Sequence, residues 1–168
     1  AIFIIAVSGQ NPNTTTTFSN NQILQSPDLY YLYWNYNTQN ITFEIHVKNA
    51  AWALFGIKGS TYSDVIVAAM FADGTGHYSE RTLNSDNTIT TNPVLNWFLL
   101  DAFTSNNYTV FKFYRNLKLQ CNQASTPSLD ITTGTNTLIF ATGSTFNQND
   151  DSIVVSNPTT VQVNLLPN

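Results

Sequence analysis

Residues 42–48 read Thr-Phe-Glu-Ile-His-Val-Lys, and this stretch decides the fold class. Polar and apolar residues alternate along it with a period of two, which is the pattern of a β-strand that buries one face. The apolar set is Phe43, Ile45 and Val47, and the polar set is Thr42, Glu44, His46 and Lys48. We therefore expect a half-buried strand whose polar face, including Glu44 and His46, is exposed to solvent.

Segments of similar composition continue along the chain on both sides of this strand. They are 29–36, 51–57, 65–71, 97–103, 108–114, 137–142, 152–155 and 160–166. Clusters of Asn, Asp, Gly and Ser separate them, as expected for turns, and no window shows the 3.6-residue apolar period of a helix. Many short strands at this spacing predict an all-β domain, either a sandwich or a barrel.

The composition indicates a folded domain of low charge. The chain has 168 residues, of which 42% are hydrophobic, enough for one core. Only 10% are charged, against about 25% in an average domain, and the net charge is −4. Six Lys and Arg residues are too few to neutralise a run of phosphates, so we expect neither nucleic-acid binding nor docking on anionic lipid.

The single cysteine and three N-glycosylation sequons bear on the cellular compartment. Cys121 has no partner in the chain, which excludes an internal disulfide and any multi-thiolate metal site. Sequons begin at Asn13, Asn40 and Asn107, and they predict a secreted glycoprotein. The abundance of Asn and Thr would also produce such triplets by chance.

The N-terminal part differs from the rest. Residues 1–9 are predominantly apolar, and 10–27 are rich in Asn, Thr and Pro without a readable element, which suggests a linker before a domain at 28–168. Three interpretations of the apolar run are open: a strand of the domain itself, a strand donated to a neighbouring subunit, or the remnant of a signal peptide. The residues of this candidate assembly strand are Ile2, Phe3, Ile4, Ile5 and Val7.

Several motifs between Leu32 and Gly143 resemble the DOMON domain, the N-terminal module of the dopamine β-monooxygenase family. They read LYWNYNTQNITFEIHVKNAAWALFGIKG, SDVIVAAMFADGTGHYSERT, NWFLLDAFTSNNYTVFKFYRNLKLQCN, Asp130-Ile131 and GTNTLIFATG. The resemblance implies an immunoglobulin-like antiparallel β-sandwich, which we expect to have about 9–11 strands. It also implies that Asp64, Asp73 and Asp130 hold turns and strand ends.

The same resemblance bears on catalysis and cofactors. Known modules of this family bind haem, sugars or partner domains, and the copper-binding catalytic domains of the monooxygenases lie C-terminal to the module. We therefore expect no catalytic activity, with an accessory role beside a copper monooxygenase as an alternative. The haem-binding branch of the family uses a methionine and a histidine late in the domain as axial ligands. Met70 is the only methionine here, and no histidine follows His77. We therefore expect no cofactor and no bound metal.

Two candidate contact features remain. Alternation along the aromatic segment 30–36 places Trp34, which matches a family core residue, on one face and Tyr31 and Tyr33 on the other. We expect these two rings to face outward, either stacking on a sugar or partner or pairing across strands. Cys121 matches a family cysteine that pairs outside the module, so it is either free or bonded to another chain.

These observations predict a secreted, glycosylated binding or assembly module, located outside the cell or at its surface. The expected partners are copies of itself, another extracellular protein or glycans, without membrane insertion. The alternative is a structural subunit whose residues 1–7 leave through the 10–27 linker and complete a sheet in the next molecule of a filament. A haem-binding redox module is a weaker alternative.

Overall fold

The computed structural model describes residues 12–92, 95–118, 129–147 and 152–167. Eleven strands are present in these ranges, and no helix. They are β1 (Asn20–Gln25), β2 (Tyr30–Tyr36), β3 (Asn40–Lys48), β4 (Trp52–Lys58), β5 (Tyr62–Met70), β6 (Gly76–Asn84), β7 (Ile89–Thr91), β8 (Trp97–Ser105), β9 (Tyr108–Asn116), β10 (Gly134–Gly143) and β11 (Thr159–Leu166).

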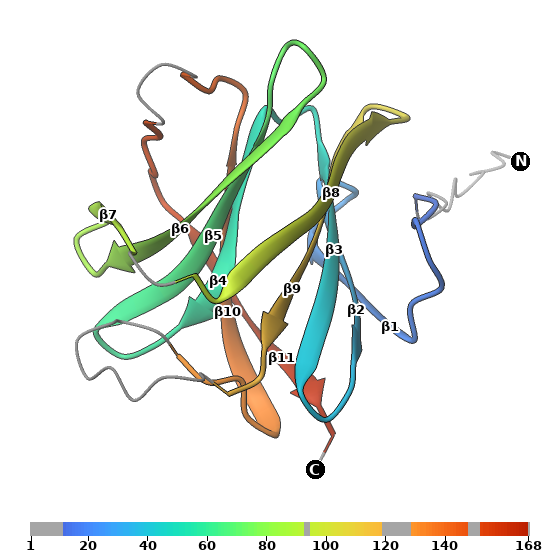
Figure 1. Cartoon of the computed structure of the whole chain (residues 1–168). Coiled ribbons are helices and arrows are strands. Elements are labelled where there is room, and N and C mark those ends of the chain that lie inside the picture. Colours follow the sequence, from blue (N-terminus) through green and yellow to red (C-terminus); the bar gives the residue numbers. More distant parts are fainter. Residues whose placement is uncertain (1–11, 93–94, 119–128, 148–151, 168) are drawn as a thin grey trace, which may run out of the picture.

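The strands form two antiparallel sheets that face each other (Figure 1). One has five strands in the order β1-β2-β3-β9-β8, and the other has six in the order β11-β10-β4-β5-β6-β7. Both orders contain non-consecutive neighbours, so the chain crosses between the sheets several times. The predicted antiparallel β-sandwich is therefore confirmed.

Aromatic and aliphatic side chains fill the space between the sheets. Phe43, Phe55, Trp97 and Phe113 lie within about 6 Å of one another by ring centroid, and all four are buried. Trp34 is also buried, as expected, and its indole Nε1 donates to the carbonyl of Leu165 at 3.0 Å. The alternation of Phe43, Ile45 and Val47 directs three side chains of β3 into this core.

A second apolar cluster lies on the outer face of the six-stranded sheet. It contains Trp52, Leu54, Val65 and Val67, with Phe146 and Ile153 packed against it from the following connection. Residues 152–155 were expected to form a strand, and that prediction is wrong: only Ser152 forms a bridge, to Asn147. The apolar residues of this segment cover a sheet face instead of joining a ladder, a role that also selects apolar residues.

The 10–27 region is not wholly a linker. Residues 20–25 form β1 and pair antiparallel with β2, from Asn20 opposite Trp34 to Gln25 opposite Tyr30. Its sequence, Asn-Asn-Gln-Ile-Leu-Gln, has only two apolar residues, because an edge strand buries little surface. The pairing with an aromatic neighbour, which composition does not reveal, is what makes this segment a strand.

The two sheets approach each other at one corner, where β6 begins beside β8. A Cβ atom added at Gly76 would lie 2.5 Å from the Cβ atom of Ala102, so the absent side chain allows the two strands to come this close. Leu99 and Ala102 of β8 and Tyr78 of β6 pack against the main core from this corner.

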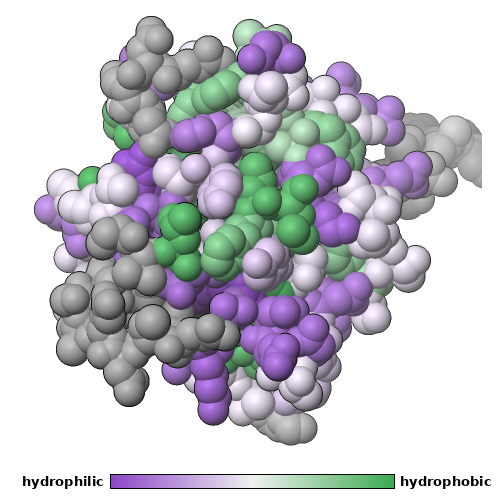
Figure 2. Space-filling model, in the orientation of Figure 1, coloured by the Kyte–Doolittle hydropathy of each residue, from purple (hydrophilic) through white to green (hydrophobic). Residues whose placement is uncertain are grey.

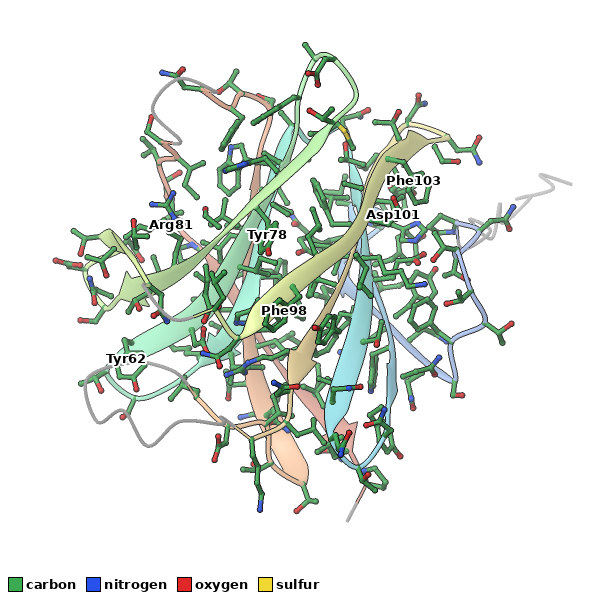
Figure 3. All side chains as sticks on the ribbon, in the orientation of Figure 1. Tyr62, Tyr78, Arg81, Phe98, Asp101 and Phe103 are labelled. Atoms are coloured by element: carbon green, nitrogen blue, oxygen red, sulfur yellow. The ribbon has the colours of Figure 1, made fainter. Side chains whose placement is uncertain are left out.

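The outer surface of β8 is more apolar than its surroundings. Figure 2 shows apolar side chains gathered over this strand, and Leu95 and Leu100 are each 52% exposed. Phe98 and Phe103 lie along β8 in Figure 3, with Asp101 between them. Phe98 stacks on Tyr114 of β9 with ring centroids 4.8 Å apart, which fixes its ring on the sheet.

Candidate functional site: the outer face of the five-stranded sheet

Polar and aromatic side chains gather on the outer face of the five-stranded sheet because strand register aligns them. Tyr33 of β2 lies opposite Glu44 of β3, which lies opposite Lys112 of β9. The next row of the same face contains Tyr31 and His46. We call the outer-face site the set Tyr31, Tyr33, Glu44, His46, Tyr108 and Lys112.

Glu44 and His46 form a buried acid–imidazole pair. Their side chains are 0% and 1% exposed, and His46 Nε2 lies 2.7 Å from Glu44 Oε1. Burial raises the pKa of Glu44, but hydrogen bonds from His46 and Thr15 oppose it, and the pKa is lowered overall. The carboxylate is therefore held in its charged, accepting form.

Tyrosine rings enclose this pair. The His46 ring lies 5.2 Å from that of Tyr33 and 6.3 Å from that of Tyr108, in edge-to-face arrangements. Tyr31 stacks on Tyr33 with centroids 6.4 Å apart. Burial, together with the nearby Tyr31, Glu44 and Tyr108, raises the pKa of Tyr33 to about 12, so its hydroxyl remains a donor at neutral pH.

Residues 12–18, which we call the N-terminal segment, lie against this site. The backbone N–H of Thr15 donates to Glu44 Oε1 at 3.0 Å, and the Thr15 hydroxyl donates to Glu44 Oε2. Lys112 Nζ donates to the hydroxyls of Thr15 and Thr16 at 3.0 and 3.3 Å. In Figure 1 the segment runs along the side of the five-stranded sheet that faces away from the other sheet.

Further contacts hold both ends of the segment. Tyr33 OH donates to the carbonyl of Pro12 at 3.4 Å, and Asn35 Nδ2 donates to the carbonyl of Thr17 at 2.9 Å. Phe18 lies 6.2 Å from the Tyr33 ring, and Lys112 Nζ lies 5.7 Å from the centre of Phe18. None of residues 12–18 belongs to a strand, so side chains of the sheet hold the segment in place of a backbone ladder.

These contacts correct two expectations. The polar face of β3 is not exposed, since Glu44 and His46 are buried. Tyr31 and Tyr33 face outward from the sheet as expected, but they are only 3% and 5% exposed, so they form no open platform. Period-two alternation identifies which face of a strand a residue is on, and it cannot show that a distant segment covers that face.

Sequence reasoning did not connect Glu44, His46 and Lys112 into one site. The signal was present in two separate places: ionisable residues two apart on one strand face, and an unbroken run of threonines at 14–17. Nothing in either pattern indicates that the two meet, because Thr15 and Glu44 are 29 positions apart in the sequence.

Met70 and His77 do not form a haem-ligand pair. His77 lies opposite Ala69 on the outer face of the six-stranded sheet, where its ring stacks 5.4 Å from that of Phe71. Met70 follows Ala69 directly, so its side chain points to the opposite face. His46 lies on the other sheet, and the residues present therefore do not fit two-ligand haem binding.

Within the described ranges, no cluster of three or more His, Cys, Asp or Glu side chains is arranged to hold a metal ion. The same ranges contain no helix of sufficient length and apolarity to span a bilayer.

The remaining predicted residues lie in different parts of the molecule. Asn13 and Asn107 are exposed, whereas Asn40 is half-buried and its Oδ1 accepts a hydrogen bond from Asn37. Asp64 and Asp73 accept hydrogen bonds from backbone N–H groups at Leu129 and Thr75, as expected. Ile2, Phe3, Ile4, Ile5, Val7 and Cys121 lie outside the described residues.

A cavity of about 630 Å³ opens at the end of the sandwich where β2 joins β3. Its floor is apolar, from Leu117, Ile131 and Leu166, and its rim carries Lys118 and Asp130. It lies apart from the outer-face site, with no residue in common.

Two facing antiparallel sheets place this protein among the β-sandwich domains. The DOMON domain family model matches residues 26–143, and the chain belongs to the DOMON family. The match extends from just before β2 to the end of β10, so it includes β2 to β10 and all six residues of the outer-face site, and it leaves out β1 and β11. DOMON domains are typically extracellular or membrane-associated modules often involved in binding.

Proposed function

We propose that this chain is a secreted, glycosylated, non-catalytic DOMON module that binds a ligand or partner through the outer-face site. The observation that carries this proposal is the buried Glu44–His46 pair with its wall of tyrosine rings. Burying ionisable groups costs free energy that a purely structural sheet face avoids by using apolar residues. The arrangement supplies an anionic acceptor and aromatic surface, which are features of recognition.

Carbohydrate is one ligand class that such chemistry suits, since tyrosine rings stack on sugars and a carboxylate accepts sugar hydroxyls. The N-terminal segment contacts Tyr33 through Pro12 and Phe18 and so limits access to its ring. A glycan array probed with the wild-type chain and with Thr15→Val tests this ligand class. Stronger glycan binding by Thr15→Val than by the wild type supports the proposal. Glycan binding that is unchanged when Glu44→Gln is added to Thr15→Val contradicts it.

A structural subunit is the second candidate function. The carbonyl of Pro12, which follows the candidate assembly strand in the sequence, accepts a hydrogen bond from Tyr33 of the five-stranded sheet. Residues 1–7 would then complete a sheet in the next molecule, with a disulfide at Cys121 as a further link. Deletion of residues 1–9, followed by measurement of mass in solution and by non-reducing electrophoresis, tests assembly. A monomeric wild-type chain across the accessible concentration range contradicts this function.

A further inference from the structure

The N-terminal segment makes the kind of contact that a bound peptide makes. Its Thr15 offers a backbone N–H and a hydroxyl to the same carboxylate, Glu44. Lys112 donates back to the hydroxyls of Thr15 and Thr16. Only a residue with a hydroxyl on its Cβ supplies both groups at this spacing, so the site distinguishes serine and threonine from valine or alanine.

The site beneath the segment consists of side chains from β2, β3 and β9. His46 holds the Glu44 carboxylate at 2.7 Å, and rings of β2 and β9 surround the imidazole. In the part of the chain that the structure describes, the buried Nδ1 atom of His46 has no hydrogen-bond partner. A buried polar atom without a partner is unusual in a folded domain, and it points to a ligand group beyond those the segment provides.

There is also room beside the segment. A hollow of about 420 Å³ is lined by residues 14–18 together with Asn21 and Tyr33. Since residues 12–18 make no sheet ladder, their release would break side-chain hydrogen bonds but no backbone pairing between strands. β1, which follows at Asn20, keeps its pairing with β2 in either state.

We propose that the outer-face site is a receptor for a serine- or threonine-rich polypeptide segment, and that residues 12–18 occupy it as an internal ligand. The partner is such a segment of another polypeptide chain, and the Glu44 carboxylate recognises it by accepting hydrogen bonds from its hydroxyl and its backbone N–H. This inference rests on the proposed binding function and names its partner class. Because the internal ligand is tethered, it competes at an effective concentration of about millimolar, and release of the segment controls access.

The test uses the full chain and a labelled synthetic peptide of residues 12–19. Thr15→Val removes the hydroxyl but keeps the N–H and the side-chain shape, so it weakens the internal ligand. We expect the variant to bind the peptide at least about tenfold more tightly than the wild type does. The internal segment loses its hydroxyl hydrogen bond to the charged Glu44 and therefore competes less well with the peptide. Adding Glu44→Gln to the variant should abolish this binding.

Matched variants separate the site from general effects. Thr14→Val is the control, since among the described residues the Thr14 hydroxyl hydrogen-bonds to the Thr16 carbonyl and to no group of the sheet. Thr14→Val should bind the peptide as the wild type does. Thr15→Ser tests rescue, because it restores the hydroxyl and keeps the Asn13 sequon, and it should bind the peptide at least about tenfold more weakly than Thr15→Val does. A peptide carrying valine at position 15 should bind Thr15→Val at least about tenfold more weakly than the natural peptide does.

Three results would overturn the inference: no peptide binding by Thr15→Val at millimolar concentration, equal binding by Thr15→Val and wild type, or binding unaffected by Glu44→Gln. Thermal unfolding of each variant confirms that it is folded. If the peptide fails to bind while a glycan binds in a Glu44-dependent way, the polypeptide partner is wrong and the proposed binding function stands. If neither binds, both fail.

Discussion

Asp64 of β5 accepts a hydrogen bond from Arg115 of β9 at 2.6 Å, and both side chains are fully buried. The pair joins the two sheets across the core, and the guanidinium also donates to the carbonyl of Leu129 and lies 4.8 Å from the Trp97 ring. Trp97 in turn donates its Nε1 hydrogen to Asp64 at 3.0 Å. The Asp64 carboxylate therefore holds Arg115 of β9, the Trp97 indole and the backbone N–H of Leu129 together.

Removal of the Asp64 carboxylate should destabilise the domain severely. Asp64→Ala leaves Arg115 charged and buried without its anion, and we expect a loss of about 3–5 kcal/mol in the free energy of unfolding. Urea denaturation measures it. The double variant Asp64→Leu with Arg115→Met should recover most of the loss, because neither charge of this pair remains in the core. A single variant as stable as the exposed control Asp101→Asn would contradict this role.

Docking of the N-terminal segment should weaken in acid. The pKa of Glu44 is lowered below its ordinary value of 4.5, so its contribution is present above that value and is lost as the pH falls through the lowered pKa. Hydrogen-exchange protection of residues 14–18 should fall over that range and should be independent of pH in Glu44→Gln. His46, Lys112 and Tyr33 are the other titratable groups beside this carboxylate, and the pKa of Tyr33, raised to about 12, lies far above this range.

A probe specific to the segment is needed because Glu80 has the opposite dependence. Burial raises the pKa of Glu80, although N–H groups of Asn96 and Trp97 oppose the shift. Its contribution to stability is therefore present below 4.5 and falls as the pH rises through the raised pKa. Global unfolding would combine the two effects, whereas exchange at residues 14–18 reports on Glu44.

Gly56 should not tolerate a side chain. A Cβ atom there would lie 2.1 Å from the carbonyl oxygen of Asp64 and 2.7 Å from the Cα of Val65, both in the neighbouring strand. Gly56→Ala must push β4 and β5 apart, and we expect a loss of about 1–3 kcal/mol in urea denaturation. Thr61→Ala, an exposed change in the turn between the same strands, is the control. Equal midpoints for both variants would show that the strands yield without cost.

Glycosylation should depend on Asn107. This residue is exposed with φ 68° in the tight turn between β8 and β9, so a glycan there contacts no core residue. Expression in a secreting eukaryotic host, followed by enzymatic deglycosylation and electrophoresis, should reveal a shift that Asn107→Gln reduces by one glycan. A wild-type chain that shows no shift would contradict the glycoprotein prediction.

The strands with strong periodicity were predictable, and the ones without it were not. Period-two alternation located β3, and apolar runs located β4 and β5, because these strands bury one or both faces. β1, β6 and β7 were missed, since their residues are largely polar and only their paired neighbours hold them in a sheet. The strand expected at 152–155 failed for the opposite reason, because its apolar residues cover a sheet face.

The sequence alone determined the fold class, the family and the faces on which Tyr31, Tyr33, Glu44 and His46 lie, because alternation and motif order are local properties of the chain. Only the tertiary structure decided that this face is covered. The contact of Thr15 with Glu44 depends on where a polar segment of no readable period comes to rest, and that is set by hydrogen bonds between residues 29 apart. For this reason the polar face of β3, which alternation predicts to be exposed to solvent, is buried.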